Sequence, residues 1–366
     1  MMKNALLLVL CGFIVLSASK PKDITFLVGS TDRADTAGIH FAALDPVTGK
    51  VTFRGFSRTG PVPGYLAFSP DKKGVFVVTG NNRVSSYKVA NGSLTPVSSQ
   101  SSNGQNPCHV SVTPSGKMAF LANYSDGSFS AYQVDRSLNL SPAVYTEQYK
   151  GSGANSQRQE KPHAHCAVVS RDGRSVFVSD LGTDKIMNYT IDAKAGQVAP
   201  NSAQPYFSVK AGAGPRHMVV HPNNKWLYIL NELDATLTAA SISKDGVLAG
   251  LDTYTTLPAD YRTPGNTSAA IRLHPNGKFV YVSNRGYNAI HGFKIGPDGR
   301  LTKVAEVREG VAIPRDFNLD PSGRFLVVGN QEKHNLTVYS VDPVTGALAY
   351  KATSERVASP SCIEFF

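Results

Sequence analysis

The side chains in this sequence that could carry out chemistry are a histidine, a glutamate and three arginines: His165, Glu232, Arg216, Arg285 and Arg315. Arginine can bind a carboxylate or phosphate through two parallel hydrogen bonds, and it can stabilise a developing oxyanion. His165 and Glu232 form a candidate pair for proton transfer, because burial and neighbouring cations can tune the pKa of each. Together these residue types favour a concave site that binds and turns over an anion.

An internal repeat indicates which elements position these side chains. Each unit has a small or polar lead, an apolar strand, a tight turn, and a second apolar strand that is followed by two more. Asp-Gly, Asn-Gly and Ser-Gly pairs stand in several of the turns, where a hairpin needs residues that tolerate positive φ. The units start 44, 57, 51, 53 and 46 residues apart, a period typical of four-stranded propeller blades. Their first two strands cover residues 63–80, 107–124, 164–181, 215–232, 268–285 and 314–331.

The two ends of the chain complete the count of blades. Residues 360–365 repeat the first strand of a unit and then stop, whereas residues 24–55 supply the second, third and fourth strands without a first. Joining them makes a blade shared between the N- and C-termini, which closes the ring and removes exposed sheet edges. The sequence therefore predicts an all-β fold, a seven-bladed β-propeller with four antiparallel strands per blade.

Alignment of the units places the candidate residues on two rings. Equivalent repeat positions are equivalent places in space, so both rings should surround the same end of the central channel. In the simpler interpretation, Arg and Glu at strand ends only neutralise one another at a solvated mouth. The first ring holds Gly64, Cys108, His165, Arg216, Ala269, Arg315 and Ser361. The second, sixteen residues later in each unit, holds Gly80, Tyr124, Leu181, Glu232, Arg285, Gln331 and, in the shared blade, Ser30.

Neither a metal nor another cofactor is predicted. His163 and His165 would lie on one face of a strand and could begin a zinc site, but only His217 or Glu232 could add a third ligand. The Asn and Asp residues that precede the second ring recur in most units, so they are predicted to cap hairpins. They are Asn123, Asp180, Asn231, Asn284 and Asn330.

The N-terminus and the composition bear on location and partners. A lysine, a twelve-residue apolar run and small residues predict a signal peptide over residues 1–19, with the propeller over 20–366. The run is too short to span a bilayer, so we expect an exported, periplasmic or secreted protein without stable membrane insertion. Net charge is +10, but no run of five Lys or Arg suggests nucleic acid. The three cysteines left after cleavage resemble no disulfide framework.

Four stretches carry a family resemblance: RQEKPHAH (158–165), GPRHMVVHPNNKWLYILNEL (214–233), HPNGKFVYVSNRG (274–286) and PRDFNLDPSGRFLVVGNQ (314–331). They resemble the lactonase propellers, a family that includes bacterial 6-phosphogluconolactonases and the fungal carboxy-muconate lactonizing enzyme. The similarity covers essentially the whole mature chain and implies a seven-bladed propeller that acts on lactones without a metal. By this resemblance the functional histidine is His165, the arginine of GPRH is Arg216 and the acid of NEL is Glu232.

These observations lead to the expectation of a sugar-acid lactone hydrolase that binds a small anionic or sugar-lactone substrate. Either Glu232 or His165 would act as general base, and the other would donate to the leaving ring oxygen. Arg216 would stabilise the oxyanion. Two alternatives stay open: a muconate-type lactonizing cycloisomerase and a non-catalytic ligand-binding propeller. Expected substrate-binding residues are Arg285, Arg315, Gln331, Tyr124, His163 and His217, with Arg158 and Gln159 on a loop placed to fold over the mouth.

Overall fold

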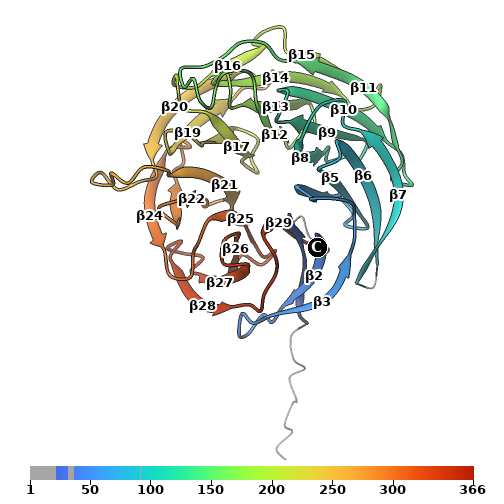
Figure 1. Ribbon diagram of the computed structural model, residues 1–366. Helices are drawn as coiled ribbons and strands as arrows, with labels where there is room; N and C mark the ends of the chain where they lie inside the picture. The colour runs from blue at the N-terminus through green and yellow to red at the C-terminus, as the bar shows by residue number, and fades with distance from the viewer. Residues whose placement is uncertain (1–21, 32–36, 91) are drawn as a thin grey trace, which may run out of the picture.

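The computed structural model describes residues 22–31, 37–90 and 92–366, and the predicted architecture is confirmed. Seven antiparallel sheets stand around a central channel (Figure 1), and no helix occurs among the described residues. Within that part of the chain, nothing helical is long and apolar enough to cross a membrane. The predicted signal peptide, residues 1–19, lies outside the described residues.

Each blade is a meander whose first strand lies nearest the channel. Blade 1 consists of β4 (Tyr65–Phe68), β5 (Gly74–Thr79), β6 (Arg83–Ala90) and β7 (Ser93–Ser101). Blade 2 consists of β8 (Pro107–Val112), β9 (Met118–Asn123), β10 (Ser128–Val134) and β11 (Leu140–Gln148). Blade 3 consists of β12 (Ala164–Val169), β13 (Ser175–Asp180), β14 (Lys185–Asp192), β15 (Gln197–Pro200) and β16 (Tyr206–Ser208). In blade 3 the outer position is divided, because β15 and β16 both pair with β14.

The remaining blades follow the same order around the ring. Blade 4 consists of β17 (Pro215–Val220), β18 (Trp226–Asn231), β19 (Thr236–Ile242) and β20 (Leu248–Thr255). Blade 5 consists of β21 (Thr267–Leu273), β22 (Phe279–Arg285), β23 (Ala289–Ile295) and β24 (Leu301–Val307). Blade 6 consists of β25 (Pro314–Leu319), β26 (Phe325–Asn330), β27 (Asn335–Val341) and β28 (Leu348–Thr353). Blade 7 consists of β29 (Pro360–Phe365), β1 (Ile24–Ser30), β2 (Gly38–Leu44) and β3 (Val51–Ser57).

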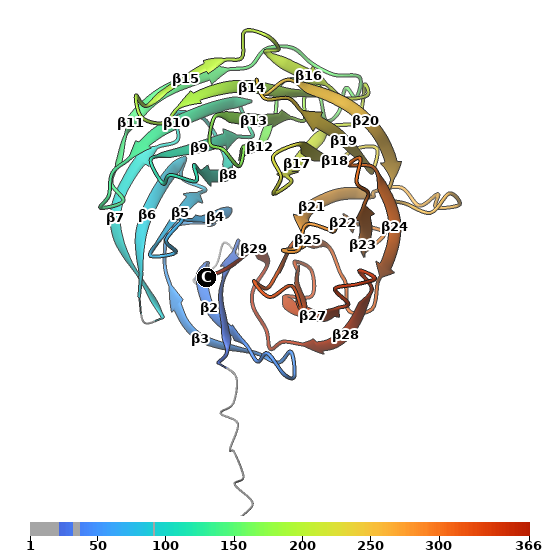
Figure 2. The same ribbon diagram turned by 180° about the vertical axis from the view of Figure 1, so that it is seen from behind.

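The ring closes by pairing the two ends of the chain. The C-terminal strand β29 lies beside β1 inside blade 7 (Figure 2), with Phe26 opposite Phe365 and Val28 opposite Ile363. The same side chains pack in one buried cluster that reaches Val327 of the neighbouring blade. Closure therefore rests on both the strand ladder and apolar burial, and it removes the free edge that an open sheet would expose.

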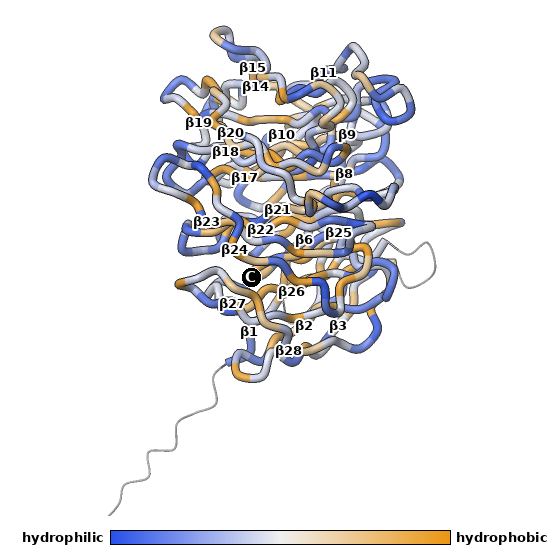
Figure 3. The backbone as a smooth tube through the Cα atoms, turned by 90° about the vertical axis from the view of Figure 1, so that its left-hand side faces the viewer, coloured by the Kyte–Doolittle hydropathy of each residue, from blue (hydrophilic) through white to orange (hydrophobic). Residues whose placement is uncertain are grey.

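Burial changes from the channel outward. The second strands, such as β9, β13 and β26, are buried along their whole length, because neighbouring blades cover both of their faces. After its buried first residue, the outer strand β11 alternates half-buried and exposed residues, since only one of its faces is covered. Apolar stretches accordingly lie within the blades, while polar ones gather in peripheral loops (Figure 3).

Polar clamps join neighbouring blades at the end of the channel away from the candidate site. The Nδ1 atoms of His221 and His274 accept backbone N–H groups of their own turns, at 3.2 and 3.1 Å. Their Nε2 atoms therefore carry the proton and donate to the carbonyls of Gly277 and Gly323 in the next blade, at 2.9 and 2.8 Å. These hydrogen bonds between blades fix the positions of the neighbouring inner strands relative to one another.

Candidate active site

A cavity of about 410 Å³ opens at the end of the channel where the inner strands begin, and we call it the mouth cavity. Eight of the residues singled out from the sequence line it together, so both predicted rings contribute to one space. The eight are His165, Arg216, Glu232, Arg285, Arg315, Gln331, Arg158 and Tyr124. Thr31, Val62, Gly64, Gly80, Asn106, Pro107 and Cys108 complete the lining.

β-Bulges at the start of the inner strands direct the first-ring residues to the mouth. In blade 4, Pro215 pairs with Asn231 and His217 pairs with Leu230, so Arg216 has no partner in the ladder. The same shift leaves Cys108, His165 and Arg315 unpaired in blades 2, 3 and 6. A bulged residue escapes the strict alternation of a strand, and its side chain can be re-aimed.

In blades 1, 2, 4 and 6, the residue that precedes the leading proline of the inner strand has left-handed backbone. Val62, Asn106, Gly214 and Ile313 have φ of 50°, 57°, 64° and 47°. For β-branched Val62 and Ile313 this conformation is strained, and such strain gathers where function demands a fixed geometry. A Cβ on Gly214 would come within 2.6 Å of the Leu233 side chain, so glycine is required there.

Backbone hydrogen bonds connect the two rings within each blade. The N–H of Glu232 donates to the carbonyl of Gly214 at 2.7 Å, and that of Tyr124 donates to Asn106 at 3.0 Å. The left-handed turn that precedes a first-ring residue therefore holds the end of the hairpin that carries the second-ring residue of the same blade. Four of the predicted hairpin caps are confirmed, since Asn123, Asp180, Asn231 and Asn330 are buried and hydrogen-bond within their hairpins. Asn284 is also buried, but its side chain bonds Thr256 and Ser268 instead of capping its own hairpin.

Glu232 is the acidic centre of the mouth cavity, with a side chain only 5% exposed. Its Oε1 accepts a hydrogen bond from Arg158 at 2.6 Å, while Oε2 lies 2.8 Å from Arg216 Nε and 3.1 Å from Arg285 Nη2. The Arg216 contact is an ion pair without the alignment of a hydrogen bond. Burial alone would raise the pKa of Glu232, but Arg285, Arg216 and Arg158 hold it below its usual value. Glu232 is therefore an ionised and fully engaged carboxylate.

The arginines outnumber this single carboxylate. Arg315 lines the cavity but has no ion-pair partner within 22–31, 37–90 and 92–366. Burial and the charge of Arg216 lower the pKa of Arg285 to about 9, and the same two causes lower that of Arg315. Although Arg285 contacts Glu232, burial and the neighbouring Arg216 outweigh this contact, and the pKa of Arg285 falls. The site lacks negative charge, so an anion would be stabilised there.

His165 stands beside these cations as a neutral imidazole. It is 5% exposed, and it meets the rings of Tyr124 and His217 edge to face at 5.5 and 5.1 Å. Burial first, then the charges of Arg216 and Arg315, hold its pKa well below the usual value. Nδ1 is buried without a hydrogen-bond partner among the described residues, which leaves Nε2 as the nitrogen that can reach a bound molecule. His165 can therefore accept a proton at neutral pH.

Three residues expected in the site lie outside the mouth cavity. His217 follows the bulge, so it re-enters the strand alternation and lines a different cavity at the far end of the channel. His163 precedes β12 instead of belonging to it. Its ring stacks on Tyr124 at 4.6 Å, and its Nδ1 lies 2.9 Å from the Tyr124 carbonyl. Because His163 lies outside β12 and His165 is the bulged residue, the strand alternation that would place both rings on one face does not apply to them.

Gln159, the third of these residues, anchors the loop that carries Arg158. It is fully buried, and its amide donates to the Leu181 carbonyl and to Asp184 Oδ1, both at 2.8 Å. Asp184 also accepts the backbone N–H groups of Gly212 and Gly214, which precede the Arg216 bulge. Gln159 and Asp184 thereby hold two loops of the mouth together, and Arg158 extends from one of them over Glu232.

Cys108 is a mouth residue to which the sequence assigned a first-ring position without a chemical role. Its first-ring position placed it correctly, but its neighbours give no chemical signal. Burial raises the pKa of Cys108 to about 12, and its thiol lies 3.3 Å from the His165 carbonyl. It is therefore a neutral thiol in the wall and no thiolate nucleophile. Among the described residues, no three His, Cys, Asp or Glu side chains form a group that could hold a metal.

Comparisons with known proteins agree with this architecture. The family model described as lactonase, 7-bladed beta-propeller, matches residues 25–365. A Bacillus subtilis (strain 168) protein named 6-phosphogluconolactonase is 30% identical over 345 residues, covering 92% of this chain and 97% of that protein. The solved structure of the Pseudomonas aeruginosa periplasmic gluconolactonase is similar with a TM-score of 0.87 and 29% identity, covering 94% of this chain and 99% of that one. A putative 6-phosphogluconolactonase from Bacteroides fragilis gives 0.87 and 28%, covering 95% and 99%.

Proposed function

Because the chain belongs to the seven-bladed β-propeller lactonase family, we propose that it hydrolyses a sugar-acid lactone in the mouth cavity. The observation that carries this proposal is a neutral His165 beside four arginines, three of which share one carboxylate. A base is thus available next to a surplus of positive charge. Ester hydrolysis needs both, since a proton leaves water while negative charge builds on the carbonyl oxygen.

In the proposed reaction, water attacks the ring carbonyl and His165 takes its proton. Negative charge on the tetrahedral oxygen is stabilised by Arg216, which uses Nη1 for the Ala269 carbonyl and Nε for Glu232 and has Nη2 left for substrate. The bond to the ring oxygen then breaks, and the imidazolium returns its proton to that oxygen. The product is an open-chain hydroxy acid. Arg285 and Arg315 face its anionic or hydroxylated arm.

The contacts of Glu232 favour His165 as the base. Both carboxylate oxygens of Glu232 already contact guanidinium groups, whereas the His165 ring lines the cavity and has no hydrogen-bond partner among the described residues. The role of the carboxylate in the proposal is to hold Arg158, Arg216 and Arg285 in their orientations. Glu232 thus acts as a positioning residue, which separates two roles that the sequence left interchangeable.

Replacing Glu232 by glutamine tests this assignment. We expect the free energy of unfolding to fall by about 3 kcal/mol, because a buried charge network loses its only acid. Turnover should fall by about tenfold, through misplaced arginines, without a change in the pH profile. Phosphate should raise the melting temperature more in the variant than in the wild type, since an anion replaces the lost carboxylate. The exposed Glu355→Gln is the matched control. A turnover loss of a thousandfold or more with unchanged stability would restore Glu232 as the base.

The lowered pKa of Arg285 predicts how anion binding depends on pH. Below pH 9 this guanidinium is charged and contributes to binding, and above its pKa of about 9 the free enzyme loses that charge. Affinity for gluconate, measured by calorimetry, should therefore be constant from pH 6 to about 8 and weaken as pH rises through about 9. The Arg285→Gln variant should bind more weakly and lose this dependence. A constant affinity up to pH 10 would contradict the lowered pKa of Arg285, and an unchanged affinity in Arg285→Gln would exclude Arg285 as an anion contact.

The direct test of the proposed function is a pH-stat assay of the mature chain with EDTA present. Glucono-1,5-lactone and 6-phosphogluconolactone are compared, and enzyme-dependent acid release on either supports the proposal. The signal peptide expected over residues 1–19 favours the unphosphorylated lactone, because it would place the enzyme outside the cytoplasm. If both lactones hydrolyse only at the spontaneous rate while gluconate still binds, the chain is a binding propeller and the proposal fails.

A further inference from the structure

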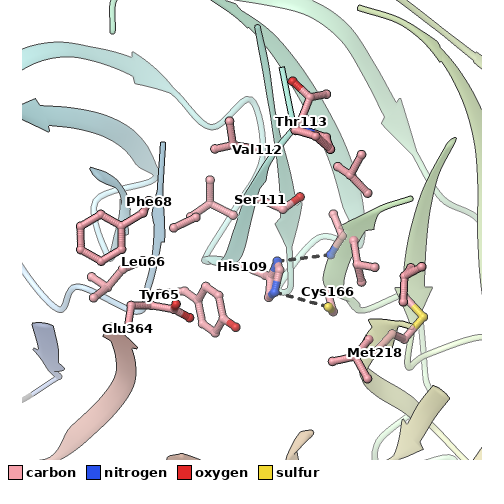
Figure 4. Close-up of a pocket in the computed structure, with 18 of the residues that line it drawn as sticks. Tyr65, Leu66, Phe68, His109, Ser111, Val112, Thr113, Cys166, Met218 and Glu364 are labelled. Carbon is pink, nitrogen blue, oxygen red and sulfur yellow. Dashed lines mark hydrogen bonds between the residues drawn. The ribbon is translucent and has the colours of Figure 1, made fainter. Parts of the chain in front are cut away.

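A second cavity, here called the distal cavity, lies at the far end of the central channel (Figure 4). Its volume is about 430 Å³, within the range of roughly 300–1,000 Å³ common for small-molecule sites. The inner strands run toward it from the mouth, and Ser69, Thr113 and Ser170 at their far turns contribute to its rim. His165 of the mouth cavity contacts His217 of the distal cavity edge to face. A layer of rings therefore separates the two spaces.

Three polar groups in this cavity have no hydrogen-bond partner among the described residues. Ser111 Oγ and His217 Nε2 are both buried and unpaired, and His217 as a whole is 6% exposed. The hydroxyl of Tyr65 likewise has none, although the residue is equally buried. Figure 4 shows Tyr65 and Ser111 around the same hollow. Buried polar groups are nearly always paired, so the buried Ser111 Oγ and His217 Nε2, together with the unpaired Tyr65 hydroxyl, favour binding of a polar molecule in this cavity.

Not every polar group here awaits a partner, and His109 shows the difference. Its Nδ1 accepts the backbone N–H of Ala167 at 3.4 Å, so Nε2 carries the proton and points to Cys166 Sγ, also at 3.4 Å (Figure 4). Its ring stacks on Tyr65 with centroids 4.2 Å apart. His109 is thus part of the cavity wall. Of the two stacked side chains, only Tyr65 has a polar group, its hydroxyl, that is available to a bound molecule.

The charged groups of the distal cavity are already engaged. Arg272 donates to both carboxylate oxygens of Asp316 at 3.1 and 3.0 Å and lies 3.1 Å from Glu364 Oε1. Lys72 donates to a backbone carbonyl at 3.1 Å. An incoming anion would meet the Glu364 carboxylate, and a cation would meet Arg272 and Lys72. This balance differs from that of the mouth cavity, which is lined by four arginines and a single acid.

We propose that the distal cavity binds an uncharged, hydroxyl-rich molecule of monosaccharide size. Hydroxyl groups both donate and accept, so they can pair with Tyr65, Ser111, a neutral His217 and the free oxygen of Glu364. Apolar wall residues such as Val112, Val168 and Val219 supply surface for the carbon skeleton. This site is separate from the proposed catalytic one, and it depends on none of the mouth residues.

The test measures binding of two probes that share a skeleton and differ in charge. D-Glucose is titrated into the full mature chain by calorimetry, first alone and then with the mouth cavity saturated by D-gluconate. We expect glucose to bind in both conditions. Tyr65→Phe and Ser111→Ala each delete one hydroxyl and should weaken glucose binding about fivefold, the equivalent of one hydrogen bond. Arg315→Ala should weaken gluconate and leave glucose unchanged.

Three results would overturn the proposal. One is the absence of saturable glucose binding, another is displacement of glucose by gluconate, and the third is unchanged affinity in both hydroxyl deletions. Lactone hydrolysis by Tyr65→Phe and Ser111→Ala reports that the variants are folded, since neither residue lines the mouth cavity. Because glucose binding is measured without turnover, failure of this proposal and failure of the lactonase proposal give different results.

Discussion

Replacing His165 by asparagine is expected to lower kcat/KM for lactone hydrolysis by about 10²–10⁴-fold, the usual contribution of a general base. Asparagine keeps a polar side chain in the bulge but cannot take the proton of the attacking water. Melting temperature should change little, because the His165 ring makes no described side-chain hydrogen bond that would be lost. The measurement is initial rate against lactone concentration, after subtraction of spontaneous hydrolysis.

A matched control lies two residues away in the sequence. His163 stacks on Tyr124 outside the mouth cavity, so His163→Asn should keep kcat within about tenfold of the wild type. Equal losses in the two variants would show that His165 acts only through packing.

The pH profile gives a second measure of the same assignment. Burial, Arg216 and Arg315 hold the pKa of His165 well below its usual value, and a base works only in its unprotonated form. Activity should therefore be level from about pH 6.5 to 8 and decline only at more acidic pH. An acidic limb centred at or above the ordinary histidine value would contradict a desolvated His165 in this role.

Replacing Arg216 by alanine should cost about 10²–10³-fold in kcat, the typical loss when one oxyanion donor is removed. The fold should survive, since Glu232 keeps Arg158 and Arg285 as counter-charges. KM should change less than kcat, because the oxyanion exists only in the transition state.

Two further arginine variants make this result specific. Arg216→Lys keeps the charge but loses the planar guanidinium, so it should recover only part of the rate. Arg315→Ala removes a cation that has no described ion-pair partner, and it should raise KM more than it lowers kcat. If Arg216→Ala altered only KM, Arg216 would be a binding residue without a role in oxyanion stabilisation.

Much of this protein could be predicted because its signals are local and repeated. The apolar period, the turn residues and the split seventh unit each depend on neighbouring residues, and six approximate copies make the pattern unambiguous. Symmetry then extends the prediction into space. Equivalent repeat positions in a closed ring must surround the channel axis. Repeat symmetry alone therefore places Arg216, Arg315, Glu232 and Arg285 at one mouth of the channel.

The repeat pattern alone therefore predicts the blade count, the closure of the ring and the end of the channel where the charges gather. Which neighbour in Pro215–His217 faces which cavity follows only from the folded chain, because a bulge breaks the alternation of a strand and leaves no mark in the residue types. Only the tertiary structure shows that Gln159 anchors its loop and that Glu232 is enclosed by three guanidinium groups. These properties depend on distances between segments remote in the chain, and such distances set burial, charge balance and pKa.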